Sequence, residues 1–128
     1  MKCLIAVAVT SILLNLSGCA AEIKREPVTF VRTSSAVSLI QLKSSADLAL
    51  EVGGSKAIVA GSRWRLVGSV PMGKVYRSED SVLTLNSRNA HEAYLVIDGD
   101  SVVGFYLPGE QSWVALKGKA LVTYQDVK

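Results

Sequence analysis

Apolar and polar residues alternate in short blocks along most of this chain. From residue 28 onward, runs rich in Val, Leu, Ile, Tyr and Thr are separated roughly every eight to twelve residues by clusters of Gly, Ser, Asn and Asp. No segment keeps a helical period over three turns, so the pattern predicts short strands. The expected strands are 28–32, 37–43, 48–52, 56–59, 63–70, 74–78, 82–86, 91–97, 101–107, 112–116 and 120–124.

Two turns between these strands are specified by their residues. Pro71 presets the second position of a turn and Gly73 suits its fourth, so 70–73 should join two antiparallel strands. Asp98-Gly99 is a strong signal for a hairpin turn of the mirror type, in which both central residues take positive φ. The second turn predicts that Ile97 pairs with Asp100.

The hairpin around Asp98-Gly99 has apolar residues on both faces. We interpret it as a central element covered on each side, or alternatively as a surface that awaits a partner. Under the second interpretation, the residues available for binding a partner are Tyr94, Phe105, Tyr106 and Trp113. Strand alternation assigns Leu95, Ile97, Val102 and Tyr106 to one face and Tyr94, Val96, Val103 and Phe105 to the other.

The whole pattern predicts a single all-β domain, built as a small antiparallel sandwich or a partly open barrel. In the strand 63–67, Trp64 and Leu66 share a face, which makes Trp64 a predicted core residue. The stretch 67–116, with its Pro-Met-Gly turn and the segment VGFYL at 103–107, resembles bacterial Src-homology-3-like small barrels. It lacks their usual tryptophan–glycine pairings, so this resemblance supplies only an alternative fold.

The first twenty residues have a different pattern. A positive start at Met1-Lys2 is followed by an apolar run over 3–14 and a small, polar stretch over 15–20, which is the layout of a secretory signal peptide. The apolar run is shorter than the roughly 20 residues that a membrane-spanning helix needs. We therefore expect residues 1–18 to be removed.

Leu16-Ser17-Gly18-Cys19 resembles the lipobox of bacterial lipoproteins. The resemblance implies cleavage between Gly18 and Cys19, a diacylglyceryl thioether on the Cys19 sulfur, and acylation of the new amino group. Ala20 stands where an aspartate tends to retain members of that family in the inner membrane, so the outer membrane is the expected destination. Several acyl chains would make the attachment stable.

The domain organisation follows from these two patterns. Residues 1–18 are the expected signal peptide, 19–27 a lipidated tether and 28–128 a single all-β domain. The tether sequence after Cys19, AAEIKREP, mixes charges without periodicity, and its eight residues reach at most roughly 28 Å. The domain should stay close to the membrane surface, on its periplasmic face.

Charge and cysteine content exclude several classes of protein. The chain has 14 Lys and Arg against 11 Asp and Glu, and these charges are scattered, so we expect no nucleic-acid binding. Its cysteines are Cys3 and Cys19, which leaves no second thiol in the mature chain for a disulfide or a thiolate metal site.

We find no set of residues typical of catalysis. His91 is the single histidine and its neighbour Glu92 lies on the opposite face of a strand, so they form no local acid–base pair. The acidic groups Glu79-Asp80 and Asp98 with Asp100 are explained by turns. No serine elbow or phosphate-binding glycine loop is present, and we expect no enzyme activity, no metal and no small-molecule cofactor.

The sequence therefore favours an outer-membrane lipoprotein, anchored by its covalent lipid, that acts as an accessory or assembly factor by binding another envelope protein. The alternative is a ligand-binding or inhibitor module, directed at a lysozyme or a cell-wall fragment, with Glu79-Asp80 and Trp113 as candidate contacts. An enzyme is the third class, and it would require His91 to meet a distant carboxylate or serine in a cleft.

Overall fold

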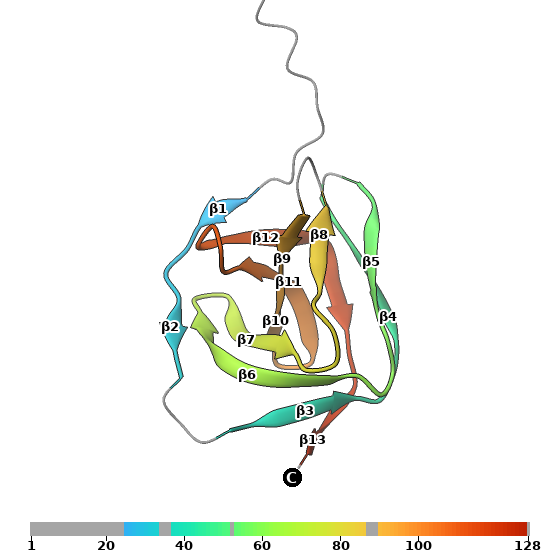
Figure 1. Ribbon diagram of the computed structural model, residues 1–128. Helices are drawn as coiled ribbons and strands as arrows, with labels where there is room; N and C mark the ends of the chain where they lie inside the picture. The colour runs from blue at the N-terminus through green and yellow to red at the C-terminus, as the bar shows by residue number, and fades with distance from the viewer. Residues whose placement is uncertain (1–24, 34–36, 52, 87–89, 128) are drawn as a thin grey trace, which may run out of the picture.

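The protein is all-β. The computed structural model describes residues 25–33, 37–51, 53–86 and 90–127, and every regular element within them is a strand (Figure 1). None of these residues forms a helix long and apolar enough to cross a membrane. The strands are β1 (Glu26–Pro27), β2 (Val31–Arg32), β3 (Leu39–Leu42), β4 (Ala46–Ala49), β5 (Ser55–Ile58), β6 (Arg63–Val70), β7 (Gly73–Ser78), β8 (Thr84–Asn86), β9 (Ala90–Glu92), β10 (Tyr94–Asp98), β11 (Ser101–Leu107), β12 (Ser112–Leu121) and β13 (Tyr124–Val127).

One large antiparallel sheet forms the body of the fold. Its strands are ordered β1-β12-β11-β10-β7-β6-β3-β13, and β2 pairs with β6 beside this path. The sheet curls strongly but does not close into a barrel. This architecture confirms the predicted all-β class and is consistent with a small sandwich or a partly open barrel.

Two small hairpins cover the inner face of the large sheet. The pairs β4–β5 and β8–β9 are separate two-stranded sheets. Leu48, Ile58 and Leu85 point from these hairpins into the main core, where they meet Trp64 and Phe105 of the large sheet. All five side chains are at most 3% exposed. Burial of apolar surface stabilises by about 25 cal/mol per Å², so this contact between layers holds the hairpins in place.

A second apolar cluster lies on the other face of the same sheet. Val75, Val96 and Tyr106 are buried there. Each is adjacent in the sequence to a residue of the main core, because successive side chains of a strand point to opposite faces of the sheet. The segment between β1 and β2 crosses over this cluster and packs Val28 and Phe30 against it. The hairpin β10–β11 is therefore a central element with both faces covered, which was the first of the two interpretations of its sequence.

The detailed register of this hairpin was predicted wrongly. Its turn consists of Gly99 and Asp100, so Ile97 pairs with Val102 rather than with Asp100. Gly99 alone of the two has positive φ, at 65°, as expected when the glycine takes the first central position of a mirror-type turn. Irregularities in the ladder shift the remaining pairs by one residue and exchange the faces of Phe105 and Tyr106 on β11.

Other boundaries also differ from the expected strands. The turn at 70–73 is confirmed, because Val70 pairs with Gly73 across two turn residues. The expected strand 28–32 is interrupted, since only Val31 and Arg32 of it pair with β6. The expected strands 112–116 and 120–124 are replaced by the continuous β12, which is followed by β13.

Candidate functional site

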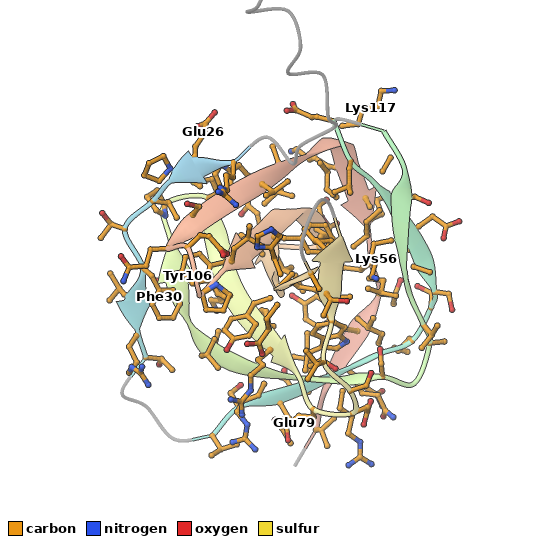
Figure 2. All side chains as sticks on the ribbon, turned by 45° about the horizontal axis from the view of Figure 1, so that its top comes forward. Glu26, Phe30, Lys56, Glu79, Tyr106 and Lys117 are labelled. Atoms are coloured by element: carbon orange, nitrogen blue, oxygen red, sulfur yellow. The ribbon has the colours of Figure 1, made fainter. Side chains whose placement is uncertain are left out.

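A groove of about 490 Å³ opens between the two hairpins of the inner layer. Residues 56–62, from β5 and the turn after it, form one wall, and residues 80–84, which lead into β8, form the other. Trp64 lines the groove between these walls and is 3% exposed. Lys56 of β5 lies on the side of the strand that faces β8 (Figure 2).

The turn that ends the first wall is fixed by hydrogen bonds. The indole Nε1 of Trp64 donates to the Ser62 hydroxyl over 3.0 Å, and this hydroxyl donates to the carbonyl of Val59 over 2.6 Å. The amide of Ala60 donates to the hydroxyl of Ser45 over 2.8 Å. Gly61 has a φ of 90°, a conformation that favours glycine. Hydrogen bonds within the domain therefore fix the conformation of this wall.

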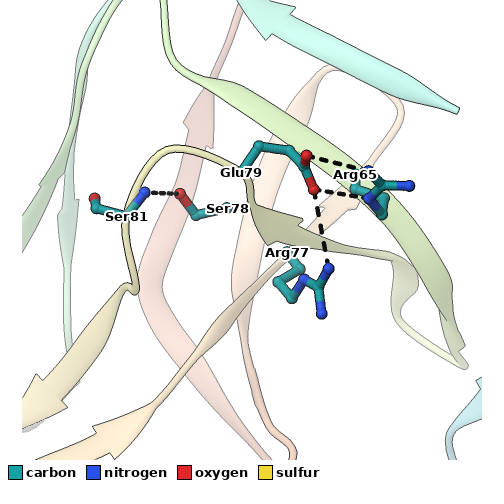
Figure 3. Close-up of polar contacts among 5 residues, drawn as sticks. All are labelled: Arg65, Arg77, Ser78, Glu79 and Ser81. Carbon is teal, nitrogen blue, oxygen red and sulfur yellow. Dashed lines mark hydrogen bonds and ion pairs between the residues drawn. The ribbon is translucent and has the colours of Figure 1, made fainter.

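The second wall is tied to the large sheet at its beginning. Asp80 Oδ2 accepts a hydrogen bond from the amide of Arg63 over 2.9 Å, and the amide of Ser81 donates to the hydroxyl of Ser78 over 3.3 Å (Figure 3). Asp80 thus sits where β6 begins, next to the turn that follows β5. Lys56 lies near the beginning of β5, so the groove has a cation at one end and a carboxylate at the other.

Backbone groups of β5 point into the groove. At the end of the β4–β5 ladder, the amide of Leu50 donates a hydrogen bond to the carbonyl of Gly54. Along an antiparallel ladder, residue pairs that exchange hydrogen bonds alternate with pairs that do not, and the pair of Asp47 with Ala57 is of the second kind. By this alternation, Ala57 directs its N–H and C=O away from β4. On the opposite wall, the amide of Ala93 donates a hydrogen bond to the carbonyl of Leu83. The next pair of the β8–β9 ladder, which contains Thr84, is therefore not hydrogen-bonded, and Thr84 directs its N–H and C=O away from β9. Among the described strands, β5 pairs with β4 alone and β8 with β9 alone.

The rim of the groove carries exposed apolar side chains. Val59 on one wall is 58% exposed and Val82 on the other is 68% exposed. Single exposed apolar residues are common on protein surfaces. Two that line the same groove form an apolar surface that a partner could cover, which would remove it from water. The groove therefore combines apolar contacts with unpaired backbone donors and acceptors.

An arginine–glutamate cluster lies in the neighbouring hollow. Arg65 donates to both oxygens of Glu79, over 2.7 and 3.1 Å, and Arg77 lies 4.0 Å from the same carboxylate (Figure 3). The hydrogen bond from Arg65 holds the pKa of Glu79 below its ordinary value, and the same bond raises the pKa of Arg65. Glu79 is thus engaged by arginines of the same domain, whereas Asp80 lines the groove and uses one oxygen to accept the hydrogen bond from the amide of Arg63.

His91 contacts a carboxylate from a distant part of the sequence. Its Nδ1 lies 3.0 Å from Oε2 of Glu110, which belongs to the turn between β11 and β12. The His91 side chain is 13% exposed, and neither residue lines the groove. The pair meets one requirement of the enzyme class, a distant carboxylate, and it lies outside the groove.

The residues expected to bind a partner lie on the second apolar cluster or in the core. Phe105 is fully buried in the main core and offers no contact surface. Tyr106 is 4% exposed, while Tyr94 and Trp113 are half-buried beside it. Cys19 and its neighbour Gly18 lie outside the described residues, so the expectations of cleavage and lipidation stay predictions.

No acidic turn forms a metal site in the described ranges. Asp100 accepts a hydrogen bond from the Ser101 hydroxyl over 3.2 Å, which fits its place in the β10–β11 turn. In residues 25–33, 37–51, 53–86 and 90–127, no three His, Cys, Asp or Glu side chains gather closely enough to hold an ion.

Comparisons with known proteins give no family. No family model matches the chain, and neither the curated proteins nor the solved structures contain a significant match.

The groove itself was not predicted from the sequence. The residues of β5 form an ordinary short strand in the hydrophobic pattern, and that pattern does not reveal which strand edges stay unpaired. The one available signal was the pair of valines, Val59 and Val82, at the ends of polar turns.

Proposed function

We propose that this chain is an outer-membrane lipoprotein whose β domain binds another envelope protein and has no catalytic role. The observation that carries the proposal is the segment Leu16-Ser17-Gly18-Cys19, which follows the apolar run 3–14 and lies only a few residues before β1 at Glu26. A lipid on Cys19 would leave the domain beside the membrane surface, within reach of envelope proteins and little else.

The form of the domain supports a binding role. The groove between β5 and β8 has fixed walls, an apolar rim and unpaired backbone groups, which are the properties of a surface that recognises a polypeptide. His91 and Glu110 provide the acid–base pair nearest to a catalytic arrangement, and they lie away from this groove. The described surface therefore supports a binding role better than a catalytic one.

The alternative of an inhibitor or ligand-binding module is less well supported. Trp113, its candidate aromatic contact, packs against Gly104 within the second apolar cluster rather than projecting from a loop. Glu79, one of its two candidate acidic contacts, is held by Arg65.

The test is mild crosslinking in intact cells, followed by purification of the protein from outer membranes. We expect one envelope protein in a fixed ratio to this chain, in preparations that carry lipid on Cys19. Recovery of the chain alone, or in a soluble fraction without lipid, would contradict the proposal.

A further inference from the structure

We propose that the groove between β5 and β8 binds one extended segment of the envelope partner as an added β-strand. This inference rests on the proposed function, because it names how that partner is held. The occupant is an extended peptide with a basic residue near its N-terminal end and an acidic residue near its C-terminal end.

The first argument comes from the backbone. Ala57 on one wall and Thr84 on the other both direct N–H and C=O groups away from their own hairpins. Strand edges of this kind pair readily with another extended chain, and main-chain hydrogen bonds then supply affinity. One inserted strand would satisfy groups on both walls at once.

The second argument comes from the layer in which the groove lies. The hairpins β4–β5 and β8–β9 both pack on the main core, yet they stay two separate two-stranded sheets. Figure 1 shows β5 and β8 side by side in this layer, and both strands line the groove or lead into it. An added strand would join the two hairpins into one continuous sheet. The volume of about 490 Å³ is within the roughly 300–1,000 Å³ of ordinary binding pockets.

The third argument is charge complementarity, which depends on the direction of the peptide. β5 and β8 run in opposite directions (Figure 1), so an inserted strand is antiparallel to one of them and parallel to the other. Three residues of β5 line the groove, Lys56, Ala57 and Ile58, whereas β8 contributes Thr84 alone, so pairing with β5 sets the direction. Antiparallel pairing with β5 places the N-terminal end of the peptide near Asp80 and its C-terminal end near Lys56. Lys56 forms no ion pair with any described residue. An acidic residue at the C-terminal end would pair with Lys56, and a basic residue at the N-terminal end would face Asp80.

The first experiment uses the purified mature chain and two synthetic peptides, KVTVSVE and its charge-reversed form EVTVSVK. We expect KVTVSVE to bind, with a change in tryptophan fluorescence from Trp64, and to bind about twofold to fivefold more tightly than EVTVSVK. Lys56→Glu should abolish or invert that preference. Lys119→Glu, at an exposed position that does not line the groove, is the matched control and should leave the preference unchanged.

A second variant tests the role of the backbone. Ala57→Pro removes an amide donor that faces the groove and places a ring in it, so peptide binding should weaken about tenfold or more. Edge strands tolerate proline at positions whose N–H points away from the ladder, as it does at Ala57, so the variant should fold. Urea unfolding of Ala57→Pro checks that the fold is retained. Absence of KVTVSVE binding, or binding unchanged in both Lys56→Glu and Ala57→Pro, overturns the proposal.

The second experiment asks whether the partner uses the groove in the cell. A photoreactive amino acid replaces Val82 at the groove, or Leu121, which is 74% exposed on β12, in the full lipidated chain. We expect the partner to crosslink from position 82 and not from position 121. Crosslinking from 121 alone overturns the inference and leaves the proposed function intact.

Two further outcomes separate the alternatives. If KVTVSVE binds as expected but no position yields a partner, the proposed function is contradicted and the strand-accepting groove stands. If the purified chain is a dimer that crosslinks to itself from position 82, the occupant is a second copy and the assignment to an envelope partner is overturned.

Discussion

The ring of Phe30 stacks on the ring of Tyr106, with centroids 4.8 Å apart and an angle of 14° between their planes (Figure 2). Phe30 lies in the segment between β1 and β2, whereas Tyr106 lies on the central strand β11. This contact fixes the N-terminal segment over the second apolar cluster. Burial raises the pKa of the Tyr106 hydroxyl, with a smaller contribution from Tyr94.

The first prediction concerns this contact. Phe30→Ala should lower the free energy of unfolding by about 2 kcal/mol, less than the roughly 3–5 kcal/mol of a fully buried phenylalanine, because Phe30 is only half-buried. Urea unfolding measures the change. Val31→Ala, at a side chain that is 60% exposed, is the control and should change stability by less than about 0.5 kcal/mol. Equal effects of the two substitutions would show that the stack contributes nothing.

The second prediction concerns Gly104 on β11. A methyl group there would overlap the carbonyl oxygen of Val114 and the ring of Trp113. Gly104→Ala should therefore destabilise the domain by about 1–3 kcal/mol, since the clash includes backbone that cannot rotate away. At Gly109 the same methyl group meets no atom within 4 Å, so Gly109→Ala should be close to neutral in thermal unfolding. A Gly104→Ala protein as stable as the parent would show that β12 can move away from β11.

The third prediction is a pH dependence from the Arg65–Glu79 pair. The pKa of Glu79 is lowered in the folded protein, so its carboxylate contributes stability that is present above the unfolded-state value of about 4.5 and is lost as the pH falls through the folded value. Glu79→Gln should therefore be less stable than the parent near neutral pH and equally stable near pH 2. Urea unfolding at both pH values measures this, and a difference that persists in acid would assign it to packing instead.

The fourth prediction concerns the anchor. Cys19→Ala should remove lipidation and cleavage, because the thiol that carries the diacylglyceryl group is absent, and the uncleaved precursor should accumulate with the same folded domain. Intact-mass spectrometry and membrane fractionation measure the outcome. Ser17→Ala, which keeps a small residue within the motif, is the control and should still be processed. A parent protein that begins at another residue would refute the assignment of Cys19.

The fold could be predicted from the sequence where local chemistry decides it. The strand 63–70 and the turn at Pro71 were correct in position, because alternation and proline geometry act within a few residues. The faces of Phe105 and Tyr106 were exchanged because irregularities at Val96–Ile97 and Val102–Gly104 shift the pairing, and simple alternation contains no information on a bulge.

The candidate site was much less predictable. The placement of Lys56 and Asp80 at the two ends of one groove depends on how two hairpins pack on a common core, which is a long-range property. The contact of His91 with Glu110 is of the same kind, since the residues lie on separate elements and share no sequence motif. Of the residues expected to bind a partner, Phe105 and Tyr106 are buried, whereas Tyr94 and Trp113 are half-buried, and their role in partner binding stays a prediction.

The pairing of β13 with β3 has a consequence for how the molecule is made. Tyr124 joins Leu42 across roughly eighty intervening positions, so β3 gains this neighbour only after nearly all of the sequence has been synthesised. A nascent chain would remain incompletely assembled throughout translation. Such late completion fits the proposal that the chain is secreted, because a polypeptide crosses a secretion channel before it acquires its final shape.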